Sequence, residues 1–318
     1  MRSVTLGPGG PQVPAVGLGC MGMSEFYAPG DESSALKTLD AAYEMGCRFW
    51  DTADIYGPHT NEALLSKALA GRRDDIVVAT KFGIERTETG EFSGVNGRPE
   101  YVKAACEASL RRLNIDCIDL YYQHRRDPDV PIEETVGAMA QLVQAGKIKH
   151  IGLSETDAEN LRKAAGEHTI AALQTEYSLW SRDVEGQILP TARELGIGFV
   201  AYSPLGRGFL TGTISSRADM EEGDWRLNNP RFEAEAIDHN RKLADQIVAF
   251  AARKGVTPAQ LSLAWVLAKG DDITTIPGTK RIKYLEENWR AGDLALSAAE
   301  VSELDDISAA HATAGERY

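Results

Sequence analysis

The sequence predicts a (β/α)8 TIM barrel of the α/β class, one domain over residues 1–318, with an N-terminal β-hairpin and extra C-terminal helices. Short apolar strands alternate with amphipathic helices eight times, which is the number of units in that barrel. A length of 318 residues, 43% hydrophobic and 25% charged, is ordinary for one large α/β domain. No Pro/Gly/Ser-rich linker and no block of like charge divides the chain, so a single domain is expected.

The first third of the chain supplies the hairpin and three strand–helix units. The hairpin is expected near residues 3–14, and AVGLG (15–19) is the first barrel strand. Apolar residues at helical spacing over 32–46 predict the first helix, which ends at Gly46. CRFWD (47–51) and DIVVATK (75–81) are short apolar runs of strand type, and their helices are predicted at 61–71 and 99–113.

The same alternation continues to the end of the chain. The fourth to eighth strands are predicted in CIDLYYQH (117–124), IKHIGLS (148–154), IAALQTE (170–176), IGFVAYS (197–203) and ITTIPG (273–278). Helices are predicted in turn at 132–146, 157–165, 186–196, within 237–269, at 281–291 and at 297–308.

One motif favours a different fold, the doubly wound open sheet that binds dinucleotides. GLGCMG (17–22) matches G-x-G-x-x-G, whose third glycine lies in a helix that starts at the loop. Here MSEFYAPGDES follows, with Pro29-Gly30 and no helical pattern until about Glu32. The context therefore argues against that fold, and we expect the glycines to serve a tight strand end.

Charge and hydropathy narrow the class of protein. A net charge of −13 argues against nucleic acid or an anionic membrane surface as the main partner. No run of about 18 apolar residues is present, and the N-terminus has no apolar secretory core. The four cysteines show no C-x-x-C pairing, so a cytoplasmic protein with reduced thiols is expected.

Polar side chains stand where the predicted strands end, which is where barrels build their active sites. DTADIYG (51–57) brings Asp51 and Tyr56, the third strand ends in Lys81, and the fourth ends in His124. Taken singly, a strand-end lysine is usually solvated, a lone histidine is usually a satisfied core group, and a tyrosine can simply cover a rim. The joint pattern indicates a site more strongly than any one member does.

These four residue types suit proton donation to a carbonyl oxygen. Free tyrosine has a pKa of about 10, and a nearby ammonium lowers it by favouring the phenolate. A carboxylate keeps that ammonium charged and in place, and a histidine can orient the carbonyl oxygen by a hydrogen bond. The group would therefore act as a general acid aimed at a substrate oxygen.

At this point the sequence resembles the aldo-keto reductases, above all a branch that includes pyridoxal and perakine reductases. The matching strings run in order from Val13 to Asn288: FWDTADIYG, VVATKFG, DLYYQHR, GLSE, QTEYSLW, AYSPLGRGFLTG and IPGTKRIKYLEEN. The resemblance implies a (β/α)8 barrel that binds NADPH/NADP+ without a dinucleotide-binding glycine motif. It also implies Asp51, Tyr56, Lys81 and His124 as a catalytic tetrad, with Tyr56 as proton donor.

The resemblance also implies cofactor-binding positions. Met21 and Asp51 would line the nicotinamide ribose, Ser154 and Gln174 would hold the carboxamide, and Tyr202 would stack on the ring. The pyrophosphate would be bound by Ser203, Leu205, Gly206 and Arg207. The adenosine 2′-phosphate and adenine would be bound by Gly278, Thr279, Lys280, Tyr284, Glu287 and Asn288. Arg281 is expected to help Lys280 select NADPH, because the two cations precede a helix N-terminus. Glu155 departs from the asparagine of many relatives, which puts one carboxamide contact in doubt.

The substrate is expected to be a small carbonyl compound bound by loops. The candidate loops are Ser24 to Pro29, Ile84 to Gly97, and Trp225 to Phe232, with Tyr27, Phe92 and Trp225 as aromatic walls and His124 on the carbonyl. The segment 211–236 is too long for a simple turn and is predicted to be a lid. Two other readings are a non-catalytic NADPH-binding subunit and a metal-dependent hydrolase using Asp51, Asp54 and His124. Nothing in the sequence sets the oligomeric state.

Overall fold

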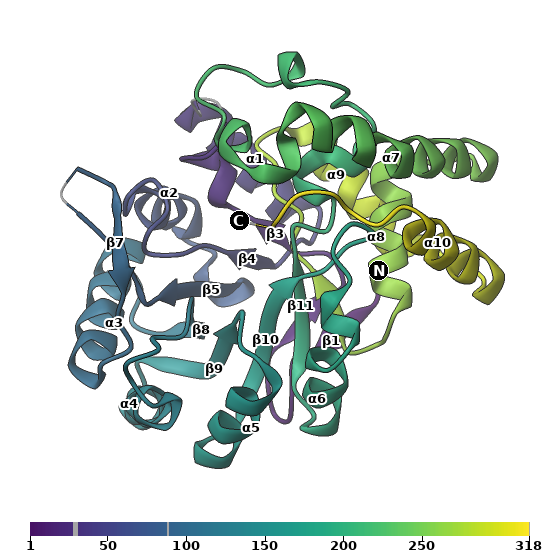
Figure 1. Ribbon diagram of the computed structural model, residues 1–318. Helices are drawn as coiled ribbons and strands as arrows, with labels where there is room; N and C mark the ends of the chain where they lie inside the picture. The colour runs from purple at the N-terminus through teal and green to yellow at the C-terminus, as the bar shows by residue number, and fades with distance from the viewer. Residues whose placement is uncertain (28–30, 88, 318) are drawn as a thin grey trace.

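Eight parallel strands form one curled sheet in the computed structural model, which describes residues 1–27, 31–87 and 89–317 (Figure 1). Neighbouring strands follow the order β3-β4-β5-β8-β9-β10-β11-β12. Their bounds are Leu18–Gly19, Phe49–Asp51, Val77–Phe82, Ile118–Gln123, Ile148–Ser154, Ile170–Glu176, Gly198–Tyr202 and Ile273–Thr275. The predicted fold class is confirmed.

The first and last strands meet and close the barrel. The Gly17 amide donates to the Thr275 carbonyl at 2.8 Å, and the Gly19 amide donates to the Pro277 carbonyl at 3.2 Å. A Cβ on Gly19 would lie only 2.8 Å from the Ile276 carbonyl oxygen, so this close approach requires glycine. The glycines of GLGCMG therefore serve barrel closure, and the open-sheet alternative is excluded.

Helices surround the strands, as Figure 1 shows. Those in the first half are α1 Glu32–Glu44, α2 Thr60–Leu69, α3 Pro99–Leu113, α4 Ile132–Gln144 and α5 Ala158–Glu167. The others are α6 Ile188–Glu194, α7 Ala234–Lys254, α8 Pro258–Ala268, α9 Ile282–Arg290 and α10 Ala298–Ala310. Side chains cap the starts of α1, α5, α8 and α10; at α8, Thr257 and Gln260 form a capping box.

The predicted N-terminal hairpin consists of β1 (Ser3–Thr5) and β2 (Gln12–Pro14), which pair antiparallel. It lies against the end of the barrel where the strands begin. A Cβ on Gly198, the first residue of β11, would lie 2.6 Å from the Leu6 Cα. The hairpin thus covers the N-terminal end of the barrel and leaves the strand C-termini open for a site.

Two predicted loops contain more structure than expected. Within 84–97, β6 (Ile84–Arg86) and β7 (Phe92–Val95) form an antiparallel hairpin. The segment 211–236 holds the short 3₁₀ turns η5 (Arg217–Asp219), η6 (Trp225–Asn228) and η7 (Pro230–Phe232), and its last residues begin α7. The sequence alternation that identifies strands is too short in these stretches to separate a small hairpin or turn from a loop. Ala28 and Pro29, at the end of the first candidate loop, lie outside the described residues.

Candidate active site

Side-chain alternation along the strands puts the reactive groups inside the barrel. In β4, Phe49 packs in the interior cluster, Trp50 packs against the surrounding helices, and Asp51 again points inward. The same alternation in β5 sends Ala79 inward and, two residues later, Lys81. Interior apolar side chains fill the barrel below, so the polar groups collect at the C-terminal ends of the strands.

Lys81 lies at the centre of the predicted tetrad and is fully buried. Its Nζ is 2.5 Å from Asp51 Oδ1, 2.7 Å from the Thr52 carbonyl oxygen and 3.5 Å from the Tyr56 hydroxyl. Gln174 donates from its side-chain amide to the other Asp51 oxygen at 2.8 Å. Burial alone would lower the pKa of Lys81, but Asp51 and Tyr56 outweigh it and raise the pKa, so the ammonium form is held in place.

Tyr56 and His124 face each other across the mouth of the barrel. Their rings meet edge to face, with centroids 5.9 Å apart. Burial raises the pKa of Tyr56 more than the Lys81 charge lowers it, so the phenol stays protonated. The expectation that the ammonium lowers this pKa is wrong in its net direction, because burial outweighs the nearby charge. Burial, together with the Lys81 and Arg125 charges, lowers the pKa of His124 well below its ordinary value, which makes this imidazole neutral.

The tetrad opens into a cavity of about 590 Å³, a size typical of ligand sites. Asp51, Tyr56 and His124 line it, whereas Lys81 lies beneath them. It is also lined by most of the positions predicted for cofactor and substrate: Met21, Tyr27, Ser154, Gln174, Tyr202, Ser203, Leu205, Arg207, Trp225, Gly278, Thr279, Lys280, Arg281 and Tyr284. Three predicted cofactor positions are not among the lining residues: Gly206, Glu287 and Asn288.

The last two of these lie on α9, and Asn288 is buried. Gly206 has a left-handed φ of 55° and packs on Trp180, where a Cβ would lie 2.3 Å from the indole ring. It lies in the turn that follows β11. A role of these three residues toward the cofactor remains a prediction.

Cations also line the cavity, near the end of β12 and around the rings of Tyr27 and Trp225. Lys280 Nζ donates to the Tyr27 carbonyl at 3.3 Å, across the cavity between the end of β12 and the loop before α1. The Arg226 guanidinium lies 5.0 Å from the centre of the Tyr27 ring, and Arg207 lies 4.6 Å from that of Trp225. Tyr27, predicted as a substrate wall, therefore contacts two of the cations that line the cavity.

Several lining residues were not singled out from the sequence. Phe26 makes edge-to-face contacts with Tyr56 and Trp225 at 6.3 Å and 6.4 Å. Its carbonyl accepts a hydrogen bond from the Trp225 amide at 3.0 Å, which joins two of the candidate loops. Arg125 also lines the cavity. Its position directly after His124 was a usable signal, but nothing in the local sequence marked Phe26.

Glu155 has a different environment from that expected of a carboxamide ligand. Its backbone is left-handed, with a φ of 53°. One carboxylate oxygen accepts a hydrogen bond from the Glu176 amide at 3.1 Å, and the other pairs with Arg317. The side chain is therefore occupied by protein groups at the edge of the cavity.

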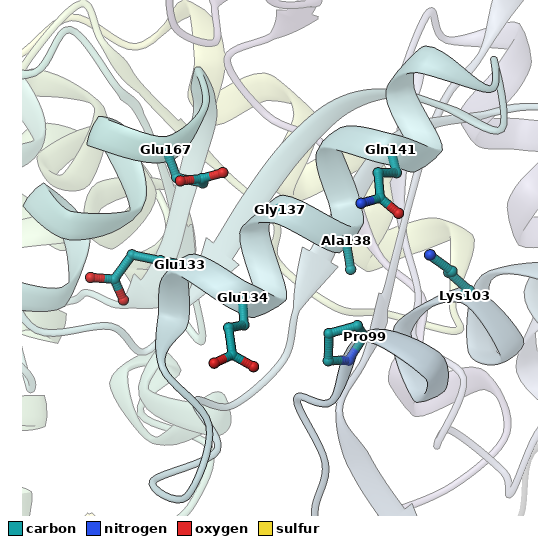
Figure 2. Close-up of a pocket in the computed structure, with 8 residues that line it drawn as sticks. All are labelled: Pro99, Lys103, Glu133, Glu134, Gly137, Ala138, Gln141 and Glu167. Atoms are coloured by element: carbon teal, nitrogen blue, oxygen red, sulfur yellow. The ribbon is translucent and has the colours of Figure 1, made fainter.

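A second hollow, of about 410 Å³, lies on the outer helical face and is separate from the strand ends (Figure 2). Its lining comes from α3, α4 and the end of α5, and consists of Pro99, Lys103, Glu133, Glu134, Gly137, Ala138, Gln141 and Glu167. None of the tetrad residues reaches it.

The metal-dependent hydrolase interpretation requires a cluster of side chains that could bind a metal ion. Across residues 1–27, 31–87 and 89–317, no three His, Cys, Asp or Glu side chains come together in a way that could hold a metal ion. In that same part of the chain, no helix combines the length and the apolar character needed to cross a bilayer.

Comparison with known proteins agrees with this geometry. The sequence model of the aldo/keto reductase family matches residues 15–309. A glycerol dehydrogenase from Gluconobacter oxydans is 27% identical, with 97% of this chain and 95% of that one aligned and a TM-score of 0.88. An aldo-keto reductase from Bacillus halodurans, in its holo form, is 30% identical over 96% of both chains, with a TM-score of 0.78. An aldo/keto reductase from Klebsiella pneumoniae, in complex with NADP and acetate, is 28% identical over 100% and 99%, with a TM-score of 0.76. A match over nearly the whole chain, together with the barrel and its strand-end site, establishes that this protein belongs to the aldo/keto reductase family.

Proposed function

We propose that this protein is an NADPH-dependent reductase of aldehydes or ketones in which Tyr56 gives the proton to the carbonyl oxygen. Membership of the family supports the coarser statement, an oxidoreductase that reduces carbonyl groups with a nicotinamide cofactor. The finer statement rests chiefly on one observation: the Lys81 ammonium joins Asp51 and the Tyr56 hydroxyl in a buried row at the mouth of the cavity.

The side chains lining the cavity fit a dinucleotide phosphate. Apolar and aromatic groups surround the tetrad, and Lys280 and Arg281 supply positive charge near the end of β12. Arg207 and Arg226 also line the cavity and pair with Glu176 and Asp224. The backbone directly after β11 turns sharply. Its φ angles are left-handed at Ser203, Gly206, Arg207 and Gly208. When bound, the cofactor would supply hydride to the carbonyl carbon. The Klebsiella pneumoniae relative was solved in complex with NADP, which supports NADPH rather than NADH as the cofactor.

The protein's own residues would orient the substrate and move one proton. The neutral His124 can donate a hydrogen bond to the carbonyl oxygen, because its lowered pKa keeps the ring uncharged. Its Nδ1 is buried with no hydrogen-bond partner among the described residues. Tyr56 then releases its proton to the same oxygen, and Lys81 stabilises the phenolate that results. Asp51 keeps the lysine charged through this step.

We place the carbonyl substrate beside Tyr56 and His124. The wall of the cavity there is formed by Phe26, Ile84, Phe92 and Trp225. Four statements stay predictions from the sequence. They are a small carbonyl substrate, membership of the pyridoxal and perakine reductase branch, a cytoplasmic location, and a single domain over residues 1–318.

The test is NADPH oxidation by the purified protein with a panel of aldehydes, ketones, quinones and pyridoxal. Turnover of at least one class is expected, and protein with Asp51, Lys81 and Tyr56 all replaced serves as the control for background reduction. Tight NADPH binding without turnover of any class would favour the non-catalytic subunit and contradict the proposal.

A further inference from the structure

The segment after α10, residues 311–317, crosses the barrel mouth instead of lying on the helical surface. In Figure 1 its yellow trace runs from α10 toward the ring of strands. Hydrogen bonds hold it along the way. Thr313 Oγ1 donates to the Trp180 carbonyl, the Ala314 amide to the Asn240 side chain, the Asn229 side-chain amide to the Arg317 carbonyl, and His239 Nε2 to the Ala312 carbonyl.

The backbone at Gly315 allows residues 311–317 to follow this path. Its φ is 88°, a left-handed conformation that favours glycine. A Cβ there would lie 2.8 Å from the backbone of Arg231, which belongs to the predicted lid. The close approach of the two backbones lets the segment reach the nicotinamide end of the cavity.

Arg317 makes the contacts at the end of this path. Its guanidinium pairs with the Glu155 carboxylate, and its Nε lies 3.7 Å from a Glu176 oxygen. The same group donates to the Tyr202 hydroxyl at 3.5 Å. Arg317 therefore touches the residue predicted to stack on the nicotinamide and the residue that directly follows Ser154.

The charge balance explains why a cation is needed at this place. The Glu155 and Glu176 side chains are mostly buried and lie next to each other at the ends of β9 and β10. Arg207 and Arg231 also pair with Glu176, whereas Arg317 pairs with Glu155. Without Arg317 the Glu155 carboxylate would lose its cation and would be expected to turn toward water. That movement would break its hydrogen bond with the Glu176 amide and disturb Ser154 and the end of β10.

We propose that Arg317 is a positioning residue for the nicotinamide end of the cofactor site. It neutralises Glu155 and holds that carboxylate against the Glu176 amide, so that Ser154, Gln174 and Tyr202 keep one arrangement toward the cofactor. The inference rests on the proposed NADPH-dependent reductase function.

The experiment measures the Kd of NADPH by quenching of protein fluorescence, without any carbonyl substrate. Arg317→Ala is expected to raise Kd about tenfold, the lower end of what a hydrogen bond to a charged group contributes. In a Glu155→Gln background, Arg317→Ala is expected to raise Kd clearly less than in the wild type, because the ion pair with Glu155 is already gone and only the contacts with Glu176 and Tyr202 are lost. Arg317→Lys keeps the cation and should recover most of the affinity.

Arg253→Ala is the matched control, since Arg253 forms an exposed ion pair with Glu303 on the outside of the molecule. Its Kd should equal that of the wild type. An unchanged Kd in Arg317→Ala, or an equal loss in both Glu155 backgrounds, would overturn the inference. If Arg317→Ala only lowered the stability of the protein, it would raise Kd to the same extent with and without the Glu155→Gln substitution. Binding is read without turnover, so a wild type that binds NADPH but reduces no carbonyl counts against the proposed function alone.

Discussion

The Nζ atom of Lys81 lies 3.5 Å from the hydroxyl oxygen of Tyr56, and both groups are buried. At this distance the ammonium lowers the energy of a phenolate far more than it could in water, because the surrounding dielectric is low. The same burial keeps the phenol protonated before the reaction. The pair can therefore hold a proton firmly and release it when negative charge develops on a nearby oxygen.

Replacing Tyr56 by Phe is expected to leave the Kd of NADPH nearly unchanged and to reduce kcat by ~10²–10⁴-fold, the range that general acid catalysis typically contributes. The ring is kept, so its edge-to-face contacts with Phe26 and His124 should survive. Steady-state kinetics and a cofactor titration on the same sample measure both quantities. A variant that keeps more than about a tenth of the wild-type kcat would show that another group donates the proton.

Replacing Lys81 by Met is expected to impair both turnover and stability. Asp51 would remain buried without its cation, and breaking a buried pair costs about 3–5 kcal/mol. The double variant Asp51→Asn with Lys81→Met removes the orphaned charge and should regain much of the free energy of unfolding while staying inactive. Denaturant titration and kcat separate the two effects. Recovery of turnover in the double variant would contradict the role of Lys81 at the phenol.

The pH dependence of kcat/KM should be flat across the range in which free histidine titrates. The His124 pKa is lowered by burial and by the Lys81 and Arg125 charges, so acidification through about 6.5 should not charge this ring. The Tyr56 pKa is raised by burial, so the donor should lose its proton only above the ordinary tyrosine value of about 10. Reduction rates over that range, with far-UV circular dichroism at each pH, test both directions. A midpoint near 6.5 would contradict a neutral His124.

Lys280→Ala is expected to weaken NADPH binding by about ten- to a hundredfold and to leave NADH binding nearly unchanged, because a hydrogen bond to a charged group contributes roughly 1.5–3 kcal/mol. The side chain already reaches over the cavity to the Tyr27 carbonyl. The overall charge of −13 should repel the 2′-phosphate, so selection has to be local. Lys283→Ala, which removes an exposed cation of α9, is the control. Equal weakening of both cofactors would show that Lys280 does not read the 2′-phosphate.

The segment 211–236 is expected to close over the bound cofactor, and its opening is expected to limit NADP+ release. The Trp225 amide is bonded to the Phe26 carbonyl, and Arg231 pairs with the buried Glu176, so the segment is tied to both sides of the cavity. Hydrogen exchange should show that the backbone amides of residues 211–236 are more protected with NADPH than without it. Equal protection in the two states would end the lid interpretation.

Local sequence was enough to predict the barrel and to place Asp51, Lys81 and His124 at its strand ends, whereas the roles of the tetrad come from the family resemblance and stay predictions. Asp51, Lys81 and His124 follow buried strands, and parallel strands of a barrel bring such positions to one end. Side-chain alternation of period two then decides that Asp51 points inward when Phe49 does. Tyr56 follows the strand end by a few residues, so its place is also fixed by short-range chain geometry.

The contacts around the site between distant segments required the tertiary structure. Phe26 has a left-handed backbone and reaches both Tyr56 and Trp225, yet its neighbours in sequence give no period that would predict this. Arg317 and Glu155 are 162 residues apart, and their pairing depends on the path of 311–317 past Gly315 and Arg231. Periodicity and capping act within a few residues and define strands, helices and their ends. The route of an irregular segment is decided by packing and hydrogen bonds with partners that are distant in sequence, and these exist only once the barrel has formed.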